Sequence, residues 1–210
     1  MKLAKYITLL KSQKFNANQI TSIYNRSHLG VITIQDFIEE ESRKELINYV
    51  KSLPLEKAPG KEGVVSQQFS ALYFGKAEGR NLPIDSPLKQ LCEEYENLYK
   101  TLQVPASFES NPAVNSIGVH CYQVQSEGIS PHRDYAKDIN LIAILTLTGK
   151  TNFLVCNGRT KLGAKLTELV TGDLTVMRAP RSLKENLLRP FHCIDQISEE
   201  RYSVIMRQRK

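Results

Sequence analysis

The sequence is poor in the residues that mark several common kinds of protein. It has no tryptophan, and its four cysteines form no CxxC pair. We therefore expect free thiols in a reducing compartment rather than a disulfide framework or a structural zinc site. An apolar run of membrane-spanning length and a cleavable leader pattern are also missing. These absences predict a cytoplasmic protein, or a nuclear one in a eukaryote, with no membrane partner.

The overall composition is that of an ordinary soluble protein. Of its 210 residues, 41% are hydrophobic and 24% are charged, as in a globular domain that folds without disulfides or a structural metal. We expect one domain over residues 1–210, acting as a monomer. The formal net charge of +6 favours an anionic partner such as nucleic acid, although a basic protein that binds nothing anionic is an equally good interpretation.

The first half of the chain has mainly helical patterns. Leu46, Ile47 and Val50 fit one helical face, and Pro87 suits the first turn of a later helix. Asp36 is a candidate cap for the earlier of these helices. The expected elements are a helical extension over 1–30, a strand over 31–34, a helix over 39–52, a strand over 64–74 and a helix over 87–102.

The second half, from about residue 110 to 208, has a β texture. Short runs of β-branched and aromatic residues alternate there with Gly, Asn and Pro turns. Strands at this spacing are typical of a sandwich or jelly roll, so the fold class is α+β, with helices first and then a mainly β core. The expected strands cover 116–124, 128–134, 140–148, 152–156, 173–177, 190–194 and 201–207.

Histidine is scarce, and two of the four histidines lie in a pattern that suits a metal. His132 and Asp134 are two residues apart in a candidate strand, so their side chains point to the same side. His192 lies in another candidate strand about sixty residues later. Two imidazoles and one carboxylate on one side of an ion form the facial triad of non-haem Fe(II) oxygenases. The pattern is weak alone, because each histidine taken singly is more often a surface or hydrogen-bonded core residue.

A second pattern follows nine residues after His192. Strand periodicity puts Arg201, Ser203 and Arg207 on one face. An arginine that points into a β core needs a partner, and a dicarboxylate cosubstrate would provide one. The phenol of Tyr122, ten residues before His132, is a further candidate donor to that carboxylate. The alternative is a solvated edge strand with ordinary surface charges.

Taken in order, these residues resemble the Fe(II)/2-oxoglutarate-dependent oxygenase superfamily. Its pattern is HxD, a distal His, and an Arg about ten residues on that is followed two residues later by Ser or Asn. Within it the chain is most similar to the AlkB-type nucleic-acid dealkylases, from about residue 30 to residue 207. The similarity includes the segment Ala71-Leu72-Tyr73-Phe74-Gly75, Tyr122 ahead of the HxD, and the Arg-x-Ser-x-x-x-Arg strand.

The resemblance implies a double-stranded β-helix core with helices packed on one side. It implies that Fe(II) is held by His132, Asp134 and His192. It implies that 2-oxoglutarate is held by Tyr122, Arg201, Ser203 and Arg207. The implied reaction uses O₂ to oxidise a C–H bond of the substrate, and for a methyl group on nitrogen the result is demethylation.

The chain departs from the AlkB-type pattern in one motif. Those enzymes typically have Asn-x-Tyr before the HxD, where this chain has His120-Cys121-Tyr122. His120 would take the place of the Asn as a hydrogen-bond donor to the cosubstrate, or it marks a different subgroup.

The favoured substrate is an alkylated base in single-stranded DNA or RNA. Without tryptophan, base stacking falls to Phe69, Tyr73, Phe74 or Tyr135, and such stacking contributes roughly 1–3 kcal/mol per base. Basic residues just before His192 are candidate phosphate contacts, although a solvated loop is the more common origin of such a run. They are Arg178, Arg181, Lys184 and Arg189.

Two other functions stay open from the sequence. One is the hydroxylation of a small anionic molecule or an amino acid. The other is a catalytically inactive barrel that acts as a binding protein.

Overall fold

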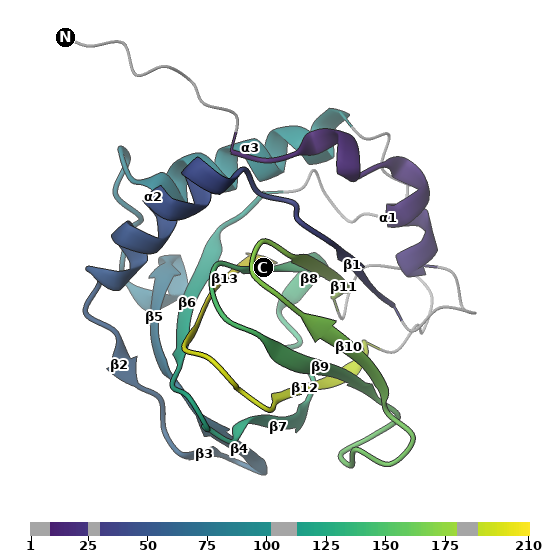
Figure 1. The fold of residues 1–210 in the computed structure, drawn as a ribbon. Helices are drawn as coiled ribbons and strands as arrows, with labels where there is room; N and C mark the ends of the chain where they lie inside the picture. The colour runs from purple at the N-terminus through teal and green to yellow at the C-terminus, as the bar shows by residue number, and fades with distance from the viewer. Residues whose placement is uncertain (1–8, 25–29, 102–112, 180–188) are drawn as a thin grey trace, which may run out of the picture.

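The computed structural model describes residues 9–24, 30–101, 113–179 and 189–210. Its β core consists of two antiparallel sheets that face each other (Figure 1). In spatial order, the larger sheet contains β1 (Val31–Ile34), β11 (Leu174–Arg178), β8 (Asp138–Thr146), β13 (Arg201–Arg209), β6 (Ser116–Tyr122), β5 (Ser70–Gly75) and β2 (Glu56–Lys57). The smaller sheet contains β10 (Lys165–Leu169), β9 (Thr151–Cys156), β12 (Phe191–Asp195), β7 (Gly128–His132), β4 (Val65–Gln68) and β3 (Lys61–Glu62). This is the predicted jelly-roll arrangement.

The helices pack on the outer face of the larger sheet, so that sheet is buried on both sides. Figure 1 shows α2 and α3 along that face, with the smaller sheet on the other side. Leu46 and Val50 of α2 and Leu91 of α3 belong to one buried apolar cluster with residues of the sheet. The helical elements are η1 (Ser12–Lys14), α1 (Ala17–Tyr24), α2 (Glu40–Lys51), η2 (Lys76–Glu78) and α3 (Pro87–Thr101). None of the described helices is long and apolar enough to cross a membrane.

Strict alternation along the central strands divides the core into two clusters. Leu141, Ala143 and Leu145 of β8 belong to the cluster beneath the helices, whereas Ile142 and Ile144 belong to the cluster between the sheets. This is the period of two expected for a strand. Strand β13 follows the same rule, so its inward positions face the smaller sheet.

Three expectations about local structure were wrong. The single strand predicted over 64–74 is divided between β4 and β5, which lie in different sheets, because the chain turns at Phe69. Strand β10 was missed, since its residues are largely exposed and have no alternation to detect. Asp36 does not cap α2; the N-cap position is Glu39 without a side-chain bond, and the Asp36 carboxylate instead pairs with Lys11 and Lys14.

Candidate metal centre

Two strands of the smaller sheet bring the candidate metal ligands together. His132 ends β7 and is the direct cross-strand partner of His192 in β12, and their ring centroids are 4.3 Å apart. Asp134 lies just after β7, and its Oδ2 is 3.4 Å from Nε2 of His192. One ligand atom from each of the three residues lies within 4.8 Å of the others, close enough to share one ion. Strand β7 is therefore shorter than predicted, but His132 and Asp134 still point to the same place.

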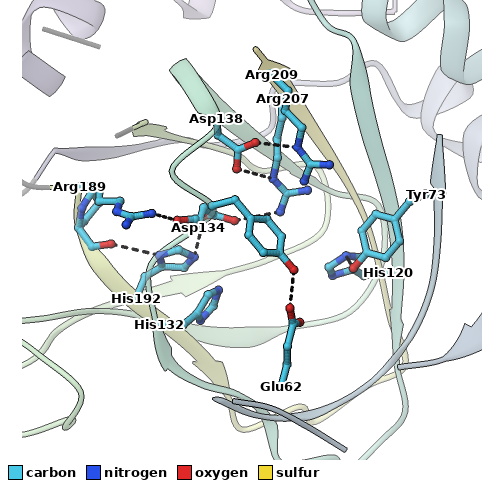
Figure 2. Close-up of polar contacts among 12 residues, drawn as sticks. Glu62, Tyr73, His120, His132, Asp134, Asp138, Arg189, His192, Arg207 and Arg209 are labelled. Atoms are coloured by element: carbon cyan, nitrogen blue, oxygen red, sulfur yellow. Dashed lines mark hydrogen bonds and ion pairs between the residues drawn. The ribbon is translucent and has the colours of Figure 1, made fainter. Parts of the chain in front are cut away.

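Both imidazoles are oriented by main-chain carbonyls. Nδ1 of His132 lies 2.9 Å from the carbonyl oxygen of Ser130, and Nδ1 of His192 lies 3.4 Å from that of Pro190. A carbonyl only accepts, so each Nδ1 carries the proton and each Nε2 keeps its lone pair. Orientation of this kind is usual around metal-binding histidines. Figure 2 shows both rings beside Asp134.

The Asp134 carboxylate is buried but ionised. Burial works against its ionisation, yet the charge of Arg207 beside it outweighs this effect, so the pKa of Asp134 falls well below its usual range. Nη2 of Arg207 lies 3.0 Å from Oδ1, whereas Oδ2 has no hydrogen-bond partner within the described residues. An anionic oxygen is therefore left facing the histidines.

A chain of alternating charges continues outward from Asp134. Arg207 also lies 3.7 Å from Asp138, which in turn lies 2.8 Å from Arg209 (Figure 2). Arg209 is 2.5 Å from Glu78. Arg207 thus has carboxylate partners within the protein, which the sequence did not reveal. Asp138 could not have been recognised, because it lies outside the strand predicted over 140–148.

Arg201 is different, because it is wholly buried without an acidic partner among the described residues. Its guanidinium donates to Oγ of Ser203 and Oγ1 of Thr146, both at 3.1 Å, and it lies 5.5 Å from the ring of Tyr122. Burial lowers the pKa of Arg201 to about 10. Arg201 and Ser203 therefore share a face of β13, as predicted. The buried guanidinium of Arg201 is one that an anion would stabilise. Thr146 shares a face of β8 with Ile142 and Ile144. A polar residue in that apolar row could have marked Thr146 as a partner of a buried polar group.

A cavity of about 30 Å³ connects the metal group to this region. Its lining includes His132, Asp134 and His192 at the metal group, and Tyr122 and Ser203 from the neighbouring sheet.

His120 lies beside the cavity as a neutral, hydrogen-bonded ring. Its Nε2 is 2.9 Å from the hydroxyl of Tyr73, its Nδ1 is 3.4 Å from that of Tyr122, and it stacks on Phe69 with centroids 4.5 Å apart. Burial, followed by the charges of Arg207 and Arg201, holds the pKa of His120 well below its usual range. His120 thus borders both the inner cavity and a larger cavity beside it.

Two larger cavities open outward from the metal group. One of about 170 Å³ is lined by two of the candidate ligands, His132 and Asp134, together with Phe69, Tyr73 and Tyr135. The other, of about 330 Å³, shares Tyr73 and Tyr135 with it. Tyr135 is half exposed, and its hydroxyl donates to Glu62 at 2.7 Å. That hydrogen bond, and then partial burial, raise the pKa of Tyr135 to about 12.

Two of the predicted substrate residues lie elsewhere. Phe74 is buried in the cluster beneath the helices, because the alternation of β5 turns it away from Tyr73 and the cavities. Arg178 is buried beside Gly30, and its Nη1 donates to the carbonyl of Ile23 at 3.0 Å, so it holds α1 rather than a substrate. Arg181 and Lys184 lie outside the described residues. Tyr73 and Tyr135 do line the outer cavities. No sequence pattern predicted Glu62 as a part of the site.

Comparison with known proteins was informative only at the level of structure. The sequence matches no protein-family model and no curated protein. A solved oxidoreductase of the 2OG-Fe(II) oxygenase family from Burkholderia pseudomallei superposes with a TM-score of 0.66 at 12% identity, covering 92% of this chain and 91% of that one. The chain has the fold of the 2-oxoglutarate-dependent Fe(II) oxygenases.

Two further solved structures share this fold. OsALKBH1 superposes with a TM-score of 0.59 at 14% identity, covering 85% of this chain and 98% of that one. A prolyl-4-hydroxylase from Pseudomonas putida gives 0.62 at 13% identity, covering 90% and 98%. At this level of identity, the similarity establishes the fold alone.

Proposed function

We propose that this chain is a 2-oxoglutarate-dependent non-haem iron dioxygenase, with Fe(II) held by His132, Asp134 and His192. The observation that carries the proposal is the meeting of two lone-pair imidazole nitrogens and one ionised, partly unpartnered carboxylate oxygen within 4.8 Å. This donor set occupies one side of an ion and leaves the other open for small ligands.

The same cavity suits the cosubstrate. Arg201 supplies a buried guanidinium without an acidic partner, with Ser203 and Tyr122 as neutral donors beside it. A terminal carboxylate of 2-oxoglutarate would give this guanidinium its partner, and a bidentate pair of that kind fixes orientation as well as affinity. We assign Arg207 to the end of the cosubstrate nearer the metal, because its Nη2 pairs with Asp134 and its Nη1 has no hydrogen-bond partner among the described residues.

Iron and 2-oxoglutarate together supply the oxidation by O₂ of a substrate C–H bond, with conversion of 2-oxoglutarate to succinate and CO₂. The protein orients the three ligands, holds the cosubstrate and keeps the cavity dry. The buried strands on both sides of the inner cavity exclude water from it. Oxidation of a methyl group on nitrogen would release formaldehyde and leave the nitrogen demethylated.

The substrate that we favour is an alkylated base in DNA or RNA. Tyr73 and Tyr135 border the cavities in front of the metal group, where a planar base can stack. OsALKBH1 shares the fold, and so does a prolyl-4-hydroxylase. Hydroxylation of an amino acid or peptide is accordingly the second candidate, and Glu62 at the cavity mouth suits a substrate with hydrogen-bond donors.

The cofactor proposal is tested by adding Fe(II) and 2-oxoglutarate without oxygen and recording the visible spectrum. We expect a metal-to-ligand charge-transfer band, since both molecules bind one site. In the variant R201M, a buried charge is replaced by an apolar chain of similar length, so the fold should tolerate it. We expect its 2-oxoglutarate affinity to fall at least about 30-fold, in line with the loss of one side of a buried charge pair.

The control variant is K44Q, which removes one positive charge from the exposed face of α2. It should give the wild-type band at the wild-type 2-oxoglutarate concentration. A wild-type protein that gives no band, or an R201M band that saturates as in wild type, contradicts the proposal. Succinate release with a methylated oligonucleotide, compared with a proline-containing peptide, then separates the two substrate classes.

A further inference from the structure

Three arginines gather around Phe191, the residue next to His192. The guanidinium carbon of Arg133 lies 4.1 Å from the centroid of the Phe191 ring, and that of Arg159 lies 5.7 Å from it. Arg189 lies close by, with Nη1 bonded to the main-chain oxygen of Asp134 (Figure 2). The three come from separate loops, after β7, after β9 and before β12, so the fold rather than the local sequence assembles them.

The cluster of Arg133, Arg159 and Arg189 has no acidic partner among the described residues. Elsewhere in the site, Arg207 and Arg209 have carboxylates at 2.5–3.0 Å. Nε of Arg133 is buried without a hydrogen-bond partner. Like charges held together in this way are stabilised by an external anion.

The cluster lies at the edge of the metal-facing cavity. Arg133 lines the cavity of about 170 Å³ together with His132, Asp134 and Tyr135. Arg159 is exposed in the turn that follows β9. A substrate group that reaches the metal can therefore continue over Arg133 toward Arg159 on the surface.

We propose that Arg133, Arg159 and Arg189 bind backbone phosphates of a single-stranded nucleic acid next to the base that enters the cavity. This inference rests on the proposed function and names the residues that hold its substrate. Planar guanidinium groups match phosphate oxygens in pairs, and three of them on separate loops suit successive phosphates along a strand better than one carboxylate. A base must leave its stack to reach a buried metal, which favours a single strand.

The test is fluorescence anisotropy with a fluorescein-labelled ten-nucleotide single strand, measured over a range of salt concentrations. Each phosphate contact contributes about −0.7 to the slope of log K against log salt for single strands. The variants R159Q and R189Q should each make the slope less steep by about 0.7 and weaken low-salt binding several-fold. R159E should weaken binding further than R159Q, and K44Q should match wild type.

Two competitors identify the ligand chemistry. A peptide nucleic acid of the same sequence, which has no phosphates, should not displace the labelled strand, and polyglutamate should do so only at much higher concentration. Displacement by the neutral strand, equal displacement by polyglutamate, or an R159Q slope equal to that of wild type overturns the proposal. The charge-transfer band of the wild-type protein is measured separately, so a failure of the phosphate site and a failure of the iron site are distinguishable.

Discussion

Asp36 shows how one exposed side chain holds a distant segment in place. Its backbone adopts a left-handed φ of 49°, and its carboxylate lies 2.7 Å from Nζ of Lys11 and 2.8 Å from Nζ of Lys14. Hydrogen bonds from these two lysines lower the pKa of Asp36 to about 2. The sequence suggested a helix cap here, because Asp is common at both caps and turns and the pattern does not separate them.

The variant D36N should remove this charge pairing and little else, since Asn tolerates the same backbone conformation. A carboxylate whose pKa is lower in the folded state than in the unfolded state stabilises the protein at every pH above the unfolded-state pKa. That contribution is lost as the pH falls through the folded-state pKa. We expect D36N to melt below wild type by no more than about 3 °C at pH 7, since exposed ion pairs contribute little. The difference should close between about pH 4 and pH 2.

The matched control is D85N, because Asp85 is exposed and forms no ion pair among the described residues. Its melting temperature should follow wild type over the same pH range. A D36N difference that persists unchanged below pH 2 would mean that the carboxylate charge is not its origin.

The residues of the candidate site differ in how far the sequence foretold them. His132 and Asp134 could be predicted as neighbours because residues two apart in a strand lie on one side, and the same rule predicted a shared face for Arg201 and Ser203. Asp138, Glu62 and the arginine cluster were not found as parts of one site. Their relations are set by loops and by the pairing of strands far apart in sequence, which no local period encodes.

At the scale of elements, the site depends on a close approach between β7 and β12. The pairing of these strands shifts register between His192 and Ile194, beside Gly128. Gly128 has a φ of 72°, and a Cβ there would lie 2.0 Å from the carbonyl oxygen of Ile194. Only glycine allows the strands to meet at this point, which in turn brings His132 opposite His192.

The variant G128A should therefore lower the free energy of unfolding. A left-handed backbone with a Cβ costs about 1–2 kcal/mol, and the steric overlap adds about 1–3 kcal/mol. Urea denaturation should show a loss of at least about 2 kcal/mol, with weaker metal binding in the protein that stays folded. The control G60A, where an added Cβ meets nothing within 4 Å, should change stability by less than about 0.5 kcal/mol.

Local patterns predicted elements best where strands are buried on both faces. The strands β6, β8, β11, β12 and β13 appeared within a few residues of their expected ends. The break between β4 and β5 was hidden, because Phe69 continues an apolar run across the point where the chain passes from one sheet to the other. A change of sheet depends on tertiary packing, which the period of a strand does not report.

At the scale of the whole molecule, the helices and the smaller sheet give the protein two separate apolar clusters on either side of one sheet. The candidate metal group lies in the inner layer, where it joins β7 and β12. An ion bound there cross-links two strands of the folded protein and has no equivalent site in the unfolded chain. Metal binding should therefore raise stability by mass action.

Manganese(II), a redox-stable substitute for Fe(II), should raise the melting temperature of the wild-type protein. At a hundred times its dissociation constant, a ligand contributes about 2.7 kcal/mol, which for a chain of this size corresponds to about 5–10 °C. EDTA should reverse the shift, and H192A should abolish it. An equal shift in H192A would place the ion elsewhere.

The two imidazoles take their orientation from carbonyl oxygens two residues earlier in the chain, at Ser130 and Pro190. Every amino acid supplies a carbonyl, so no particular side chain has to be preserved at those positions for the rings to face inward. The arrangement therefore requires few specific side chains, and the surrounding sequence can vary. A protein built in this way can retain inward-facing imidazoles while its sequence diverges until only the fold resembles that of distant relatives.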